Sequence, residues 1–445
     1  MTMTNDVRRS VMARNGISFA RWVPNSFVIA CLLTFVTFAL VVSVAGKTFL
    51  DAEGYWVKGF WELLELTMQL ALIVITGYIV AVSPLMSRLL ERVAELASSD
   101  RAAVALMGVV SMTASWLHWG LGLIAGPIFL RFLIRKHPRV DYRLAVAAGY
   151  LGSTCTWHAG LSGSAPLLMA TPKNFMEAQV GLVPISSTTF SVFNLVLTIV
   201  VVCVMTMMLM RLYPRKPDAY VPSHETTEDP HAASSAKALW IERSYALNLV
   251  MGCLGAIGLW TLYVEGGSRV SLNVFNFAFL FLALVLHPSP ASFTRAAAQG
   301  ATYLHGIVIQ FPFYAGMYGL IKYSGLAEII ARWFTSIASA KTFPLVIYWY
   351  SGVVSFFIPS GGSKWAVEAP YVMAAAKALS VPSSHAILAY AWGDMSTHFL
   401  QPFWAIPLLA IARVEFKDII GYLAILFVVN FVVVSAAFML LPYLM

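Results

Sequence analysis

Four short segments of an otherwise apolar chain carry the small and polar residues that could do chemistry, at 115–122, 160–166, 359–364 and 396–402. Glycine lets the backbone leave helical geometry, and the free N–H groups where a helix starts carry partial positive charge that suits a carboxylate. We expect substrate contacts from Ser162, Gly163, Ser164, Ser360, Gly361, Gly362, Ser363, Lys364 and Gln401. Helix packing through small residues is the alternative for one such segment alone, whereas two segments at matching positions favour a binding site.

Placing an ionisable side chain inside an apolar membrane segment costs free energy, and such residues commonly serve transport or proton transfer. Asp394, His158, His398 and Glu368 are therefore the candidates for carrying a coupling proton. A lone buried histidine that only packs is the alternative for each imidazole. Lys364 lies four residues before Glu368, on the same face of a helix. It either meets a substrate carboxylate or neutralises Glu368, and the sequence leaves both open.

Three tryptophans, Trp157, Trp365 and Trp404, lie beside these segments. Their rings could form the wall of an apolar substrate pocket. Ordinary core packing is the alternative interpretation for each of them.

The sequence contains no GxxxxGK[ST], HExxH or GxSxG motif, so no catalytic residue is expected. The four cysteines lie at irregular spacing without a CxxC pair, so neither a metal site nor a cofactor is expected. A membrane-embedded enzyme or sensor subunit is the rival class. It is disfavoured because no stretch is typical of a soluble catalytic or signalling domain.

The composition indicates an all-α polytopic membrane protein. Hydrophobic residues make up 59% of the chain and charged residues only 11%, against about 25% in soluble domains. The net charge of +8 does not indicate a nucleic-acid partner, because Lys and Arg collect on the cytoplasmic side of membrane proteins. The N-terminus is expected to lie in the cytoplasm.

Apolar runs give the expected elements: 25–45, 63–85, 102–134, 143–170, 183–213, 244–263, 270–287, 300–323, 342–376, 385–412 and 418–443. The runs 102–134 and 342–376 are too long for one helix, and each predicts a re-entrant helical hairpin. The runs 143–170 and 385–412 predict transmembrane helices that break at a Ser/Gly or His/Gln/Pro segment. Shorter amphipathic runs at 86–99 and 325–340 predict interfacial arms, or else ordinary surface helices.

The chain also repeats itself, since 63–170 and 303–412 follow one plan at an offset of about 240 residues. Tyr150 and His158 correspond to Tyr390 and His398. With an internal N-terminus and two hairpins, most of the 29 Lys and Arg residues lie inside. In that topology the hairpins open to opposite sides, which predicts two inverted repeats, each with a re-entrant hairpin and a broken transmembrane helix.

The expected domain organisation follows from these runs. It consists of a cytoplasmic head (1–24), a first membrane repeat (25–213), a cytoplasmic linker (214–242), and an extra span with the second inverted repeat (243–445). The linker is assigned from its richness in proline, serine and charged residues.

Four motifs give the chain a specific resemblance. They are SGSAPLLMATP at 162–172, QFPFYAG at 310–316, PSGGS at 359–363 and QPFWAIP at 401–407. These residues closely resemble the bacterial short-chain fatty acid transporter (AtoE) family over nearly the whole chain. The family is similar to ion-transporter superfamily carriers, and this resemblance implies inverted repeats with re-entrant hairpins and a homodimer.

The resemblance implies a bacterial inner-membrane location and uptake of a small monocarboxylate such as acetoacetate or butyrate, through a lipid bilayer, with proton symport as the coupling. A sodium ion is the alternative coupling ion. A cation-coupled di- or tricarboxylate or inorganic-anion carrier is the alternative function, since Lys364 would suit a second substrate charge.

Overall fold

The computed structural model describes residues 26–217, 239–265, 267, 270–356, 358 and 360–443. The expected cytoplasmic head at 1–24 lies outside these residues, as do most of the expected linker at 214–242 and Pro359 of the second predicted turn. Helices form the described part of the chain, and no strand occurs in it, so the prediction of an all-α polytopic protein is confirmed.

The first half of the chain supplies helices that correspond closely to the expected runs. Their bounds are α2 Ser26–Ser43, α3 Phe49–Phe60, α4 Leu64–Ala81, α5 Pro84–Ala94, α6 Asp100–Leu117, α7 Trp119–Lys136, α8 Tyr142–Cys155, η1 Trp157–Ala159, α9 Ser164–Met169, α10 Glu177–Val180 and α11 Val192–Leu212. Helix α3 was not expected from the apolar runs, because Asp51, Glu53 and Lys58 interrupt its hydrophobic pattern.

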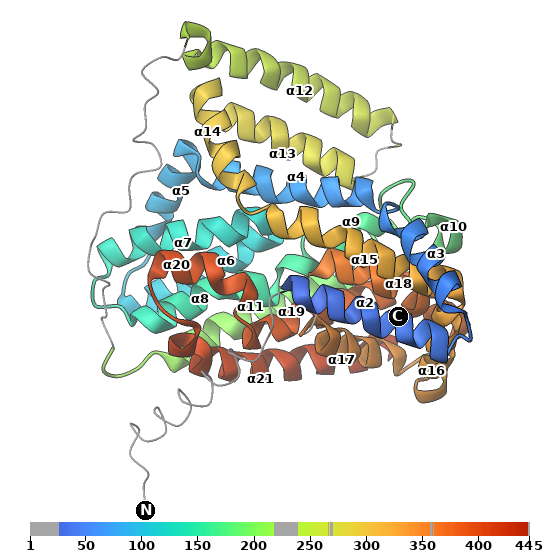
Figure 1. The fold of residues 1–445 in the computed structure, drawn as a ribbon. Helices are drawn as coiled ribbons and strands as arrows, with labels where there is room; N and C mark the ends of the chain where they lie inside the picture. Colours follow the sequence, from blue (N-terminus) through green and yellow to red (C-terminus); the bar gives the residue numbers. More distant parts are fainter. Residues whose placement is uncertain are drawn as a thin grey trace, which may run out of the picture.

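The second half repeats the arrangement after two additional helices, α12 and α13. Its bounds are η2 Trp240–Arg243, α12 Tyr245–Glu265, α13 Leu272–Leu286, α14 Pro290–Ala301, α15 His305–Ser324, α16 Leu326–Ile337, α17 Phe343–Ser355, α18 Gly361–Ala378, α19 Ser383–Ser396, η3 Thr397–Leu400, η4 Phe403–Ala405, α20 Ile406–Ala412, α21 Phe416–Leu440 and η5 Leu441–Tyr443. Helix α12 lies at the edge of the molecule, where it packs mainly on α13 (Figure 1).

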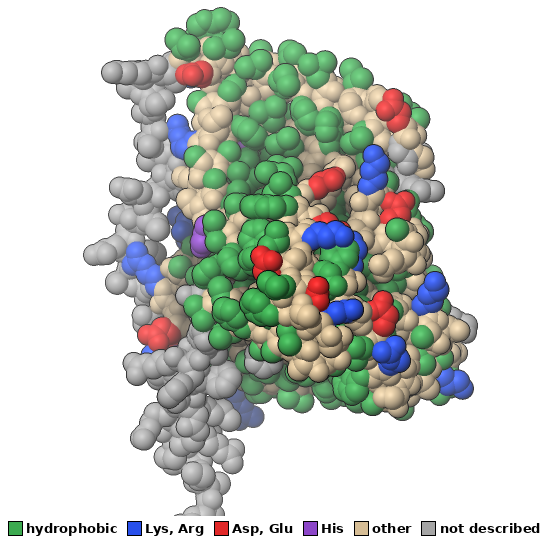
Figure 2. Space-filling model, turned by 45° about the vertical axis from the view of Figure 1, so that its right-hand side comes forward, with side chains coloured by type: hydrophobic (Ala, Val, Ile, Leu, Met, Phe, Trp, Pro, Cys, Tyr) green, Lys and Arg blue, Asp and Glu red, His purple; other side chains and the backbone are tan. Residues whose placement is uncertain are grey.

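Apolar side chains cover much of the outer surface, as a bilayer requires. In the described residues, four helices are long and apolar enough to cross a membrane: α4, α11, α12 and α21 with its 3-10 extension. Helices α14 and α15 qualify together as a further span, bent by 51° at their break. Figure 2 shows one face on which hydrophobic side chains are widespread and charged side chains are scattered among them.

Both long apolar runs divide into two helices. The first divides inside the predicted turn at 115–122, whereas the second divides mainly before the predicted turn at 359–364, because residues 361–364 belong to α18. His118 alone separates α6 from α7, which contact each other, because its extended backbone (φ −159°, ψ 112°) ends one helix and begins the next. Its Nδ1 accepts the backbone N–H of Leu121 at 3.2 Å and so caps α7. The second pair, α17 and α18, breaks between Ser355 and Gly361.

Corresponding helices make the same contacts in the two halves of the chain. Helix α7 contacts α4, α5, α6 and α8, and α18 contacts the corresponding α15, α16, α17 and α19. The hydrogen bonds correspond as well: Ser111 Oγ donates to Gly149 O at 2.6 Å, and Ser351 Oγ donates to Tyr390 O at 2.8 Å. The internal repeat is therefore present in the packing as well as in the sequence.

Candidate functional site

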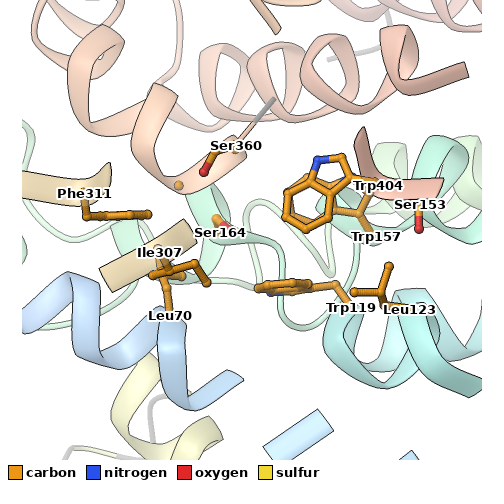
Figure 3. Close-up of a pocket in the computed structure, with 12 residues that line it drawn as sticks. Leu70, Trp119, Leu123, Ser153, Trp157, Ser164, Ile307, Phe311, Ser360 and Trp404 are labelled. Carbon is orange, nitrogen blue, oxygen red and sulfur yellow. The ribbon is translucent and has the colours of Figure 1, made fainter. Parts of the chain in front are cut away.

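Two cavities that share part of their lining lie where the broken segments of the two halves meet. The smaller one, named the inner cavity, has a volume of about 40 Å³, and the larger one, named the outer cavity, of about 440 Å³. They share the lining residues Trp119, Leu123, Ile307, Phe311, Ser360 and Trp404. The inner cavity, shown in Figure 3, has room for little more than a water molecule, whereas the outer one could hold a small organic acid.

One side of the inner cavity carries the polar lining. It is formed by Ser153, Ser164, Ser360, Gly361 and Gly362, from α8, α9 and the start of α18. A Cβ atom on Gly362 would lie 3.6 Å from the Oγ of Ser164, so the SerGlySer segment of the first half touches the SerGlyGlySer segment of the second. The tertiary structure thus brings together two predicted segments that are nearly 200 residues apart.

The first turn of α18 faces this polar side. An α-helix leaves its first backbone N–H groups without an intrahelical acceptor, which makes Gly361, Gly362 and Ser363 donors for an anion. Ser360 precedes the helix without capping it, and its Oγ lies 2.8 Å from the Oγ of Ser363. Two hydroxyls and several backbone N–H groups therefore converge at one end of the cavity.

Aromatic and aliphatic side chains form the remaining walls. The ring of Trp119 lies edge-on to Trp157 and Trp404, with centroid distances of 6.1 and 5.9 Å. Leu70 and Phe311 complete the inner wall from α4 and α15 (Figure 3). Trp157 and Trp404 thus lie at the cavity, whereas Trp365 is buried against Tyr390, with ring centroids 4.5 Å apart.

Three predicted substrate residues lie behind the cavity wall, where they hold the broken segments in place. Ser162 Oγ accepts the N–H of Trp119 at 2.9 Å, joining the first break to the tip of the first hairpin. A Cβ on Gly163 would approach the carbonyl oxygen of His158 to 2.2 Å, so this close approach requires glycine. Gln401 Nε2 donates to Ser355 O at 3.2 Å.

Lys364 is fully buried and does not line either cavity. Its Nζ lies 3.2 Å from Asp394 Oδ1 and 4.0 Å from Glu368 Oε2, and it donates to Ser351 O at 2.7 Å. The pair expected from the spacing of four residues is present, but the contact with Asp394 is shorter. Asp394 in turn lies 2.8 Å from His158 Nδ1.

His398, the remaining candidate for the coupling proton, has no direct contact with Lys364 or Asp394. Its Nδ1 lies 2.9 Å from Ser153 O, and its ring stacks on Trp157 with an interplanar angle of 9°. It therefore contacts the aromatic wall and has no direct ion contact with Asp394.

Several residues at the site gave no signal in the sequence. Leu70, Ile307 and Phe311 line the cavity but look like any other apolar residue of a membrane helix. Ser351 and Tyr390 hold Lys364 through a hydrogen bond of 2.6 Å and a cation–π contact of 4.4 Å. The repeat identifies Tyr390 as the counterpart of Tyr150, but the sequence predicts neither Tyr390 nor Ser351 as a partner of Lys364.

Comparison with known proteins places the chain in a family. The sequence model of the family described as short chain fatty acid transporter matches residues 8–441. A protein of Escherichia coli is 36% identical over 91% of this chain and 93% of its own length, and one of Haemophilus influenzae is 33% identical over the same shares. Both carry the provisional name of short-chain fatty acid transporter.

Two solved structures have a similar fold. The YdaH transporter of Alcanivorax borkumensis, whose topology was described as unusual, aligns with a TM-score of 0.59 at 17% identity, over 94% of this chain and 97% of YdaH. MtrF of Neisseria gonorrhoeae, described within a class of antimetabolite efflux pumps, aligns with a TM-score of 0.56 at 14% identity, over 96% and 97%. At these identities the likeness concerns the fold alone.

Proposed function

Because the chain belongs to the short chain fatty acid transporter family, we propose that it carries short-chain monocarboxylates, such as butyrate or acetoacetate, by proton symport. Membership of this family makes the protein a membrane transporter and not an enzyme, as expected from the sequence. The substrate class, the coupling ion and the site are our proposal.

The composition of the cavity is the observation that carries the proposal. Its polar side offers the hydroxyls of Ser164 and Ser360 and the first N–H groups of α18, which suit one carboxylate. Its other walls are apolar, which suits a hydrocarbon tail. Among the described residues that line the two cavities there is no Lys or Arg. A substrate with a single negative charge therefore fits better than a di- or tricarboxylate.

Proton coupling would involve the ionisable residues beside the cavity, which are His158, Asp394, Glu368 and His398. A Cβ on Gly361 would lie 2.8 Å from Asp394 Oδ2, so the carboxylate lies directly behind a residue that lines the cavity. Support for alternating access comes from the matching contacts of α7 and α18. We propose that the two repeats are inverted, with re-entrant hairpins α6–α7 and α17–α18 enclosing one shared site.

The remaining features of the proposal concern the cell. We propose an inner-membrane location with a cytoplasmic N-terminus, from the distribution of Lys and Arg. The proposed units are the head at 1–24, the first repeat at 25–213, the linker at 214–242, and the extra span and second repeat at 243–445. A homodimer is proposed from the family resemblance.

Uptake of labelled butyrate into proteoliposomes tests the function. Accumulation driven by an inward proton gradient, and inhibited by unlabelled acetoacetate but not by succinate, is the expected result. Accumulation driven only by sodium would assign the coupling to sodium. Inhibition by succinate as strong as that by acetoacetate would favour the di- or tricarboxylate carrier.

A further inference from the structure

One buried lysine lies between two buried carboxyl groups behind the cavity wall. The side chains of Lys364, Glu368 and Asp394 are at most 1% exposed. Lys364 Nζ is 3.2 Å from Asp394 Oδ1 but 4.0 Å from Glu368 Oε2. The lysine therefore pairs with Asp394 in this conformation, and Glu368 lies just outside hydrogen-bond distance.

The hydrogen bonds of His158 indicate that it adds no second positive charge. Its Nε2 lies 3.1 Å from the backbone N of Ala165 and accepts that N–H, so this nitrogen carries no proton. The proton must then be on Nδ1, which donates to Asp394 Oδ2 across 2.8 Å. A neutral His158 thus donates to Oδ2 of an ionised Asp394, while the charged Lys364 forms an ion pair with its Oδ1 at 3.2 Å without completing a hydrogen bond.

Glu368 has no comparable partners. Neither of its carboxyl oxygens completes a hydrogen bond by distance and angle among the described residues, and the Tyr350 hydroxyl is the side-chain donor that faces them. The other titratable groups around it are tyrosines: Tyr350 and Tyr371, whose hydroxyls lie 2.8 Å apart, and Tyr390 on α19. Helices α15 and α16 also pack on α18, but Glu328 and Arg332 are exposed there, and Lys322 pairs with Glu62 near the surface.

One positive charge thus serves two buried carboxyl groups, and a second ionised carboxylate would be left without compensation. We propose that Glu368 is the site of the coupling proton, and that Lys364 exchanges Asp394 for Glu368 when this proton leaves. This inference rests on the proposed function and narrows its coupling candidates to one residue. The step needs no co-reactant: the carboxyl group of Glu368 releases a proton, and its carboxylate then attracts the ammonium group of Lys364.

The geometry also connects this exchange to the cavity. Tyr390 lies against Lys364, with Nζ 4.4 Å from the ring centroid, and its hydroxyl donates to Gly361 O at 2.7 Å. Asp394, once released by Lys364, would face the glycine that lines the cavity. The protonation state of Glu368 would therefore change the charge beside the proposed carboxylate site.

The first repeat has no counterpart of this cluster. Helix α7 corresponds to α18, and both contain an internal proline, Pro127 and Pro370. Residues 119–130 at the start of α7 include no charged residue. The shared architecture of the two repeats therefore does not require the charges, which favours a functional role for them in α18.

Glu368→Gln tests the proposal, because glutamine resembles a permanently protonated glutamate. Purified wild-type and variant proteins are reconstituted and compared in two assays: counterflow of labelled butyrate without an ion gradient, and accumulation driven by an inward proton gradient. We expect the variant to retain counterflow and to lose accumulation above the equilibrium level. A variant that still accumulates butyrate would overturn the proposal and leave Asp394 or His398 as the proton site.

Thermal unfolding in detergent provides a second readout. If Glu368 is neutral in this conformation, Glu368→Gln will unfold at the wild-type temperature or above it, whereas a variant that fails to fold would contradict the neutral state. Wild-type protein without butyrate counterflow would instead contradict the proposed function. Failure of the Glu368 proposal and failure of the proposed transport function therefore give different results.

Discussion

Asp394 Oδ2 lies 2.8 Å from His158 Nδ1, and this contact joins α19 of the second half to η1 of the first. Both side chains are completely buried, and the two residues are 236 positions apart. Because a Cβ on Gly361 would touch both of them, the contact lies directly behind the cavity. The two halves are thus held together beside the proposed substrate site.

Replacement of Asp394 by asparagine should destabilise this conformation, because Lys364 Nζ loses its partner at 3.2 Å and Glu368, at 4.0 Å, must ionise to replace it. Removing one partner of a buried pair typically costs about 3–5 kcal/mol. Thermal unfolding in detergent, monitored by circular dichroism, would measure the loss of stability. Lys417→Gln removes an exposed pair with Glu415 and serves as the control, in which little change is expected. Equal stability of both variants would argue against a paired Asp394.

Two serines that are separated by one residue should behave differently. Ser164→Ala removes a hydroxyl from the cavity lining, so the apparent KM for butyrate should rise while the unfolding temperature stays unchanged. Ser162→Ala removes the acceptor of the Trp119 N–H, so it should lower stability by about 1–3 kcal/mol. Kinetics and thermal unfolding of both variants would separate the two roles. Ser336→Ala, at an exposed position of α16, is the matched control.

Gly361 should tolerate no side chain. A Cβ at this position would lie 2.6 Å from both His158 Cε1 and Trp157 Cη2, which is closer than real Cβ atoms approach. Gly361→Ala should therefore displace the histidine from Asp394 and abolish butyrate counterflow. Gly54→Ala in α3 is the control, since a Cβ there would meet nothing within 4 Å. Normal counterflow in Gly361→Ala would mean that this wall is not part of the transport path.

Because the cavity walls are aromatic and apolar, affinity should rise with the length of the substrate's hydrocarbon tail. The outer cavity of about 440 Å³ leaves room for additional methylene groups, each of which contributes about 0.8 kcal/mol when buried, or about fourfold in affinity. Inhibition of labelled butyrate uptake should therefore become stronger from unlabelled butyrate to pentanoate to hexanoate, by about fourfold per added methylene group. Trp404→Ala should weaken this progression by removing part of the wall, whereas Trp260→Ala, on the exposed face of α12, should not. A progression that is unchanged in Trp404→Ala would place the hydrocarbon tail elsewhere.

The sequence alone determined the fold class, the positions of most helices and the family. Hydrophobic runs and helix-breaking residues are local properties, so the breaks at His118, Ser164, Gly361 and Thr397 could be located from composition and spacing. Helix α3 was missed because its charged residues interrupt the apolar pattern on which the prediction depended. Membership of the transporter family also followed from short motifs, and the comparisons confirm it.

Only the tertiary structure decided which residues of these segments face a cavity and which ones pair. Spacing predicted Lys364 beside Glu368, because both lie on one helix, but it could not predict the shorter contact with Asp394 on another helix. Likewise, Ser162 and Ser164 look equivalent in sequence, yet one caps a hairpin tip and the other lines the cavity. Local sequence determines where a helix can break, whereas side-chain partners depend on long-range packing between two halves that are about 240 residues apart.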